Sequence, residues 1–225
     1  MVELVALQVA NAKRWATVKP TRSFASVARA LVAPAAKARY QFVAEKTGVP
    51  WFFIAVVHER ESSQNWNASL AQGDPWNKVS VHVPAGRGPF MSWQDAAIDA
   101  LVNCSPHAAR NKDWSPGALL TLLEEYNGLG YASRGLPSPY LWAGTDQYKS
   151  GKFVRDGVFN PDAVDGQLGC AGLLLAMMAL DPSIDLSKPA SAGAPPSITA
   201  PAAGSIGAAI AAILKAILSM FKKGK

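Results

Sequence analysis

A chain of 225 residues is long enough for one domain of catalytic size and an appendage, because single domains commonly have about 100 to 200 residues. The formal net charge is +6, but five of the 22 basic residues follow Asp185, the last acidic residue, so residues 1–187 carry 17 basic and 16 acidic residues. Nucleic-acid binding requires a basic patch on the folded domain or a basic run interleaved with aromatic residues. Neither pattern is seen, so we expect no nucleic-acid partner.

The N-terminal segment and the cysteines exclude further classes of protein. Residues 1–15, MVELVALQVANAKRW, contain an acidic residue at position 3 and no long apolar stretch before a cleavage site, so no Sec signal is predicted and synthesis in a host cytoplasm is expected. Cys104 and Cys170 are too few for a disulfide framework and have no partners at zinc-site spacing. We interpret them as two small buried hydrophobic residues, with a single disulfide as the alternative.

Two helical segments are predicted in the first third of the chain. Residues 22–47 favour helix, with Ser23 as the expected N-cap, a break at Pro34 and an end at Gly48. The segment GVPWFFIAVVHERESS begins another helix, with Pro50 in the first turn, where its missing N–H costs nothing. The middle of this second helix is apolar on every side, which is typical of a helix surrounded by protein.

A short β element is predicted next. After a Gly-Asp-Pro turn, Val79, Val81 and Val83 alternate with Ser80 and His82, and Gly and Pro residues follow. Alternation of this kind between turn residues indicates a strand or hairpin.

Two more helices follow this element. Residues 92–102 favour a helix capped by Ser92, with Asp95 three residues later as in a capping box. Residues 115–128 begin with Ser-Pro and end with Gly, which predicts a helix between them.

The rest of the chain defines the predicted organisation. A loop rich in Gly, Pro and aromatic residues extends to about residue 160, and residues 162–180 provide a last core helix. The predicted fold class is therefore mainly α, with one small β-hairpin. We predict a catalytic domain over residues 1–180, a Pro/Ala/Ser-rich linker over 181–204 and a separate amphipathic helix over 205–225.

Carboxylates at the end of the apolar helix suggest acid–base chemistry. A glycosidase needs one carboxyl that is protonated near neutral pH and a second group that stays ionised. Burial at the end of an apolar helix raises the pKa of Glu59 or Glu61, whereas Asp74 in a polar turn stays ionised. These arguments do not distinguish the two glutamates. Ion pairing with Arg60 or Lys46 is the alternative interpretation.

The helix that ends in Glu61-Ser62 resembles the catalytic helix of the lysozyme superfamily, particularly goose-type lysozymes and soluble lytic transglycosylases. In these enzymes the acid is the Glu directly before Ser. Goose-type enzymes also carry a Gly-Asp pair after that Glu, and Gly73-Asp74 lies at the same offset here.

Other motifs extend the resemblance over about residues 45–180. The segment EEYNGLGY is similar to the Tyr-Asn segment that lines the sugar cleft of those families. The ordered set Glu-Ser, Gly-Asp-Pro, VPAGR, YNG and SPYLW resembles phage and proteobacterial peptidoglycan hydrolases of the lysozyme type.

The resemblance implies an α+β lysozyme-like fold and assigns roles to particular residues. Glu61 would be the general acid and Asp74 the base or stabilising carboxylate, while Ser80, Tyr126 and Asn127 are candidate substrate-binding residues. No metal and no organic cofactor is expected. The goose-type second aspartate has no clear counterpart in this chain.

The residues before Glu61 are expected to support it. Glu61 should face a cleft between its helix and the small β element, with Arg60 and Glu59 as supporting charges. His58 is interpreted as a hydrogen-bonded structural residue, because the chemistry of the superfamily needs no imidazole.

The C-terminal segment predicts a basic amphipathic helix. Apolar residues recur at helical spacing, namely Ile206, Ile210, Ile213, Leu214, Ile217, Leu218 and Phe221. Lysines lie beside them and at the end, namely Lys215, Lys222, Lys223 and Lys225. Such a helix after a flexible linker favours contact with anionic membrane or outer-membrane lipid. The alternatives are a helix docked on its own domain and a transmembrane span, for which the apolar run is short.

These observations lead to one main hypothesis for function. We expect a monomeric phage endolysin of Gram-negative hosts, a muramidase that cleaves the β-1,4 bond between N-acetylmuramic acid and N-acetylglucosamine in the periplasm. One alternative is a lytic transglycosylase, in which Glu61 acts as acid and then as base and the product is a 1,6-anhydro sugar. The other is a membrane-active peptide on an inactive wall-binding domain.

Overall fold

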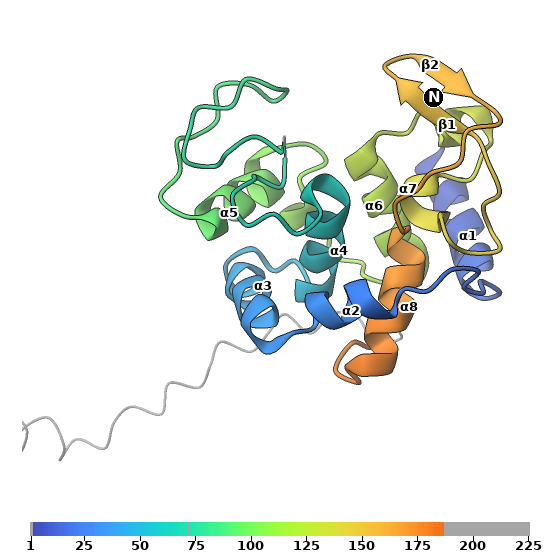
Figure 1. Cartoon of the computed structure of the whole chain (residues 1–225), viewed down its shortest axis with the longest axis horizontal. Helices are drawn as coiled ribbons and strands as arrows, with labels where there is room; N and C mark the ends of the chain where they lie inside the picture. The colour runs from blue at the N-terminus through green and yellow to red at the C-terminus, as the bar shows by residue number, and fades with distance from the viewer. Residues whose placement is uncertain (1, 72, 187–225) are drawn as a thin grey trace, which may run out of the picture. The chain divides into compact units, whose positions relative to one another are not determined.

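The computed structural model describes residues 2–71 and 73–186. This part of the chain is mainly helical, with one small antiparallel sheet, as predicted (Figure 1). The helices are α1 (Leu4–Trp15), α2 (Ala25–Leu31), α3 (Pro34–Thr47), α4 (Trp51–Ser62), α5 (Trp93–Asn103), α6 (Pro116–Asn127), α7 (Pro139–Trp142) and α8 (Cys170–Leu180), with 3-10 turns at Ala108–Arg110 and Ala132–Arg134. The strands are β1 (Lys152–Arg155) and β2 (Val158–Asn160).

Helix α4 forms the centre of this fold (Figure 1). Its residues from Phe52 to His58 are all buried, as the uniformly apolar sequence predicted. Helices α3, α6 and α8 pack against it. Because each fully buried large apolar side chain contributes about 1.5–3 kcal/mol, α4 is held firmly and its C-terminal end is fixed in space.

Proline and glycine set several helix boundaries where the sequence predicted them. Pro34 opens α3, and Gly48 ends it with a positive φ of 74° that favours glycine. Ser92 caps α5, because its hydroxyl accepts a hydrogen bond from the Asp95 N–H at 3.1 Å. Gly128 follows the last residue of α6.

The predicted cap at Ser23 is wrong. Helix α2 begins one residue later than expected, and its N-cap residue is Phe24, which makes no side-chain capping bond. The Phe24 side chain is buried in the core. Tertiary packing of this ring therefore decided the start of the helix.

The predicted strand at residues 79–83 is also wrong, because this segment is an irregular loop. Val79, Val81 and Val83 are 55%, 78% and 87% exposed, so alternation here does not produce a buried face. The backbone N–H of Ser80 donates to the carbonyl of Arg87 at 2.8 Å, which folds the loop on itself instead of pairing it with a strand.

The hairpin lies instead at β1 and β2, inside the region predicted to be a loop. The strands pair antiparallel, with Phe153 opposite Phe159, and an irregularity lies between Phe153 and Arg155. Asp156-Gly157 forms the turn, with a φ of 71° at the glycine. An Asp-Gly pair between short apolar segments is a known hairpin signal, so the sequence did contain this element.

Helix α1 was not predicted, and it packs along α6. Asn11 of α1 is buried and donates a hydrogen bond to the Thr121 hydroxyl at 3.1 Å. Gly117 allows the close approach, because a Cβ at this position would lie 2.5 Å from the carbonyl oxygen of Gln8. The outer face of α1 exposes Val5 and Val9, which weakens the amphipathic signal in the sequence.

The C-terminal end of the described region completes the core. Helix α8 begins at Cys170 and not at the predicted residue 162, because the preceding segment is irregular and Gly169, its N-cap residue, is extended. Cys104 and Cys170 are both free and buried, as the first interpretation proposed. Ile184 and Leu186 are buried beyond α8. The predicted helix at 205–225 and most of the predicted linker lie outside the described residues.

None of the helices in residues 2–71 and 73–186 has the length and apolar character needed to cross a membrane.

Candidate active site

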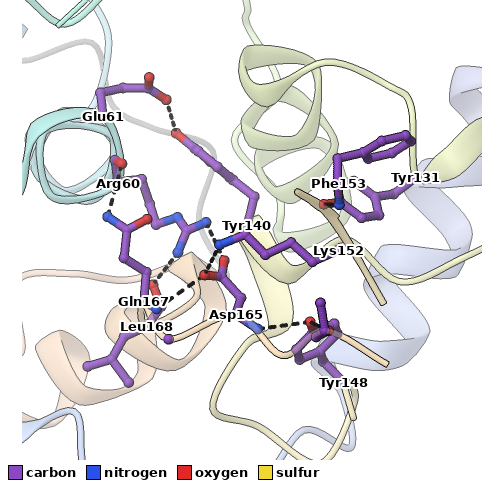
Figure 2. A network of polar contacts seen from close by, with 12 residues as sticks. Arg60, Glu61, Tyr131, Tyr140, Tyr148, Lys152, Phe153, Asp165, Gln167 and Leu168 are labelled. Carbon is purple, nitrogen blue, oxygen red and sulfur yellow. Dashed lines mark hydrogen bonds and ion pairs between the residues drawn. The ribbon is translucent and has the colours of Figure 1, made fainter. Parts of the chain in front are cut away.

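Glu61 lies in the last turn of α4 and forms one specific contact. Its Oε1 accepts a hydrogen bond from the hydroxyl of Tyr140 in α7 at 2.8 Å (Figure 2). Burial raises the pKa of Glu61 to about 7, although the Tyr140 hydrogen bond and the charge of Arg60 both act to lower it. A carboxyl with this pKa holds its proton in a large fraction of molecules at neutral pH.

A cavity of about 460 Å³ opens beside Glu61. Its walls come from the end of α4, the start of α7, residues 127–131, the β1–β2 hairpin and residues 165–167. This volume lies in the range of about 300–1,000 Å³ that small-molecule sites occupy. The prediction that Glu61 faces a cleft beside the β element at 79–83 is wrong in its β element, because the cavity is lined by the hairpin at 152–160 and by no described residue of 79–83.

The geometry also separates the two glutamates that the sequence left open. Glu59 accepts a hydrogen bond from the Gln64 side chain at 2.9 Å. Among the described residues that line the cavity, Glu61 is present and Glu59 is not. Glu61 is therefore the better candidate for an acid that reaches a bound molecule.

An ion-pair network around the buried Asp165 carboxylate lies at the wall of the cavity (Figure 2). Arg60 and Lys152 both donate to Asp165, with 3.0 Å from Arg60 Nη2 to Oδ2 and 2.9 Å from Lys152 Nζ to Oδ1. The Asp165 side chain is only 3% exposed. Burial opposes its ionisation, but the bonds from Lys152 and Arg60 outweigh burial and hold the pKa of this carboxyl below its ordinary value.

Arg60 connects this network to the carboxyl of Glu61. Its guanidinium carbon lies 4.7 Å from the centre of the Tyr140 ring, the same ring whose hydroxyl bonds Glu61. Arg60 Nη1 also donates to the carbonyl of Leu168 at 3.2 Å. The prediction that Arg60 supports Glu61 is consistent with these contacts.

Asp74 lies in a different environment. Its Oδ2 accepts hydrogen bonds from the backbone N–H groups of Val81 and His82 at 2.9 and 3.0 Å, and its Oδ1 lies 2.6 Å from His82 Nδ1. The bonds from His82, with that from Val81, lower the pKa of Asp74, so this carboxyl is ionised as predicted. Both oxygens thus hold the 79–83 loop, and Asp74 is not among the described residues that line the Glu61 cavity.

Of the three candidate substrate-binding residues, Asn127 alone is among the described residues that line the cavity. Asn127 is exposed and lines the cavity. Tyr126 instead donates its hydroxyl to the carbonyl of Leu70 at 3.2 Å. Ser80 is buried and donates its hydroxyl to the carbonyl of Pro84 at 3.1 Å, within its own loop. Neither Tyr126 nor Ser80 is among the described residues that line the cavity.

His58 has the structural role that was predicted. It is fully buried, and its Nδ1 lies 2.9 Å from the hydroxyl of Tyr40. The rings of Trp66 and Trp93 pack on it with centroid distances of 4.5 and 4.7 Å. Burial lowers the pKa of His58 to about 4, so the imidazole is neutral near pH 7.

Sequence reasoning did not single out Tyr140, Lys152 or Asp165 as functional residues. Tyr140 lies in the SPYLW motif and is one of several aromatic residues near the motifs that suit the faces of sugar rings, but no contact with Glu61 was predicted for it. Asp165 is more than a hundred positions from Glu61, and no local pattern marks it. The folded chain brings these three residues to the same cavity.

Within the described residues, no group of three or more His, Cys, Asp and Glu side chains is placed to hold a metal ion. Comparisons of the chain with protein-family models, curated proteins and solved structures gave no match. A function can therefore be inferred only from the residues and geometry of the chain itself.

Proposed function

We propose that the chain is a peptidoglycan-degrading enzyme of the lysozyme-like type, a muramidase with Glu61 as its general acid. The observation that carries this proposal is the place of Glu61, a carboxyl on the wall of a cavity that is fixed by a hydrogen bond from Tyr140 and has a pKa of about 7. General acids need a pKa near the working pH, so that they are protonated before the reaction and release the proton readily.

The contacts of Glu61 support a simple proton transfer. Tyr140 donates to Oε1, so the acidic proton is left on Oε2. In the proposed reaction Oε2 donates this proton to the glycosidic oxygen as the bond to the sugar carbon breaks. The carboxylate that results keeps the Tyr140 hydrogen bond and the nearby positive charge of Arg60.

In the muramidase, Asp74 is the proposed second carboxylate, which would orient water or stabilise positive charge on the sugar. For this role one carboxylate oxygen of Asp74 would have to be released from its bonds to the 79–83 loop, or a substrate would have to reach the loop. A water molecule activated in this way gives a product with an ordinary reducing end.

A second candidate function, lytic transglycosylase, is favoured by a specific observation. The oxygens of Asp74 are bonded to Val81 and His82, and those of Asp165 to Arg60 and Lys152. A transglycosylase needs neither carboxylate, because Glu61 acts first as acid and then as base toward a hydroxyl of the substrate itself. Its product is a 1,6-anhydro sugar.

Digestion of purified peptidoglycan tests both candidates. Mass spectrometry of the soluble products separates reducing ends from 1,6-anhydro ends. Asp74→Asn should impair release of reducing ends strongly, whereas it should leave anhydro products nearly unchanged. Absence of any soluble product from the wild-type chain would reject both enzymatic proposals and favour a wall-binding domain without activity.

The cationic segment at 205–225 is proposed to contact anionic lipid and to aid access to the wall from outside the outer membrane. Each lysine near an anionic surface contributes about 1 kcal/mol at low salt. Truncation after Leu186 should keep activity on stripped cell walls and lose killing of intact Gram-negative cells. Equal killing by the truncated and full-length chains would reject the lipid role.

A further inference from the structure

We infer that Asp165 is a positioning residue for Glu61, which neutralises Arg60 and Lys152 and fastens the β1–β2 hairpin to the end of α4. The inference rests on the proposed role of Glu61 as a general acid. It extends that role to the residues that keep the acid in its working state.

The position of Asp165 is fixed by contacts that do not involve its carboxylate. Its backbone N–H donates to the Tyr148 hydroxyl at 3.1 Å. Arg22 donates to the carbonyls of Asp165, Gly166 and Gln167, at 3.3, 2.9 and 2.8 Å. The backbone contacts of residues 165–167 therefore fix the position of the Asp165 carboxylate at the cavity wall, without depending on its bonds to Arg60 and Lys152.

The carboxylate joins two separate elements. Arg60 Nη2 donates to Oδ2 from α4, and Lys152 Nζ donates to Oδ1 from β1 (Figure 2). The Gln167 side chain adds a bond to the carbonyl of Arg60 at 3.3 Å. The Asp165 carboxylate thus links the hairpin that forms one wall of the cavity to the helix that carries Glu61.

Charge balance around Glu61 depends on this anion. The titratable groups that interact with Glu61 from the packed elements are Arg60 on α4, Tyr126 on α6, Tyr140 on α7 and Cys170 on α8. Arg60 is the only cation among these described groups, and its charge favours the ionised form of Glu61. Asp165 offsets that charge at 3.0 Å and so preserves the protonated form.

Removing the negative charge of Asp165 should shift the pKa of Glu61 in one direction only. Arg60 and Lys152 would lose the carboxylate that compensates them. The uncompensated charge of Arg60 stabilises ionised Glu61, so the pKa of Glu61 falls by about 0.5–1 unit, as expected for a charge in a partly screened site. A general acid is needed in its protonated form, so the alkaline limb of the pH–activity profile moves to lower pH.

The test combines three substitutions in the full-length chain. Asp165→Asn should move the alkaline limb downward by about 0.5–1 pH unit. Asp162→Asn is the matched control, because Asp162 is an exposed residue in the same segment whose backbone N–H donates to the Asn160 side chain, while its carboxyl has no hydrogen bond within residues 2–71 and 73–186. It should leave the limb where it is.

The double variant Asp165→Asn with Lys152→Met separates charge from structure. It removes one negative and one positive charge, so the limb should return toward the wild-type pH. If the role of Asp165 is purely structural, the double variant should lose more activity than Asp165→Asn, and its alkaline limb should not return toward the wild-type pH. If Asp165→Asn does not fold, Lys152→Met alone should move the limb upward, and an unmoved limb overturns the inference.

A direct titration makes the inference independent of the enzymatic proposal. The Glu61 carboxyl carbon can be followed by NMR against pH in the wild-type chain and in Asp165→Asn. A wild-type chain without activity on peptidoglycan rejects the proposed function, while the titration still decides the role of Asp165. Equal Glu61 titration midpoints in Asp165→Asn and Asp162→Asn overturn the inference.

Discussion

The last turn of α4 and the loop that follows this helix carry carboxylates in opposite environments. Glu61 lies at the end of a buried helix, with one hydrogen bond and a pKa raised by burial to about 7. Asp74 lies in a polar loop, where donors from His82 and Val81 lower its pKa. The surroundings therefore determine whether a carboxyl is protonated: burial beside an apolar helix favours the protonated form, and backbone N–H donors favour the ionised form.

The largest loss of activity is expected when the proposed general acid is replaced. Glu61→Gln keeps the volume of the side chain and its contact with Tyr140 but cannot donate a proton, so activity on peptidoglycan should fall about 10²- to 10⁴-fold. Turbidity loss of cells without their outer membrane measures it. Glu59→Gln is the control and should retain most activity. The opposite result for these two variants would exchange their roles.

The next largest effect is on how the free energy of unfolding depends on pH. The pKa of Glu61 is higher in the folded chain than its ordinary value of 4.5, so its contribution is fully present below about pH 4.5 and is lost as pH rises through about 7. Glu61→Gln removes this loss and should be more stable than wild type at pH 8 by about 1–3 kcal/mol, with little difference at pH 4. Chemical denaturation at both pH values measures the difference. A variant less stable than wild type at pH 8 contradicts the raised pKa.

A smaller effect is expected at Tyr140. Its hydroxyl stabilises the ionised form of Glu61, so Tyr140→Phe should raise the pKa of Glu61 by about one unit. The alkaline limb of the pH–activity profile should move upward by the same amount. Tyr131→Phe is a useful control, because its hydroxyl accepts a bond from the Phe153 N–H and lies in the same cavity without a bond to Glu61. A limb that stays in place in Tyr140→Phe would show that the hydrogen bond does not act on the acid.

The smallest effect on stability is expected at Asp74, and its dependence on pH is opposite to that at Glu61. The pKa of Asp74 is lower in the folded chain, so its stabilising contribution is present above its ordinary pKa of 3.8 and is lost as pH falls through the folded value. Asp74→Asn should speed amide hydrogen exchange at Val81 and His82 at neutral pH, while the rest of the domain stays protected. Unchanged exchange at these two amides would show that the carboxylate does not hold the loop.

The sequence predicted some elements well and others poorly, and the residues explain why. Proline and glycine act on their own backbone, so the breaks at Pro34, Gly48 and Gly128 were predicted correctly. The strand at 79–83 was wrong, because a period of two predicts a strand only where one face is buried. The Asp156-Gly157 turn was a better signal for the true hairpin.

The burial of α4 and the presence of carboxyls in its last turns could be predicted from the sequence, because composition and helical spacing are local properties of the chain. Three features could not be predicted from the sequence: Glu61 and not Glu59 lines the cavity, Tyr140 donates a hydrogen bond to Glu61, and Asp165 joins Arg60 to the hairpin. These contacts join residues separated by about 80 to 105 positions, as the Glu61–Tyr140 and Arg60–Asp165 bonds show. Such contacts leave no local pattern, because they depend on how α4, α7 and the segment before α8 pack around one core.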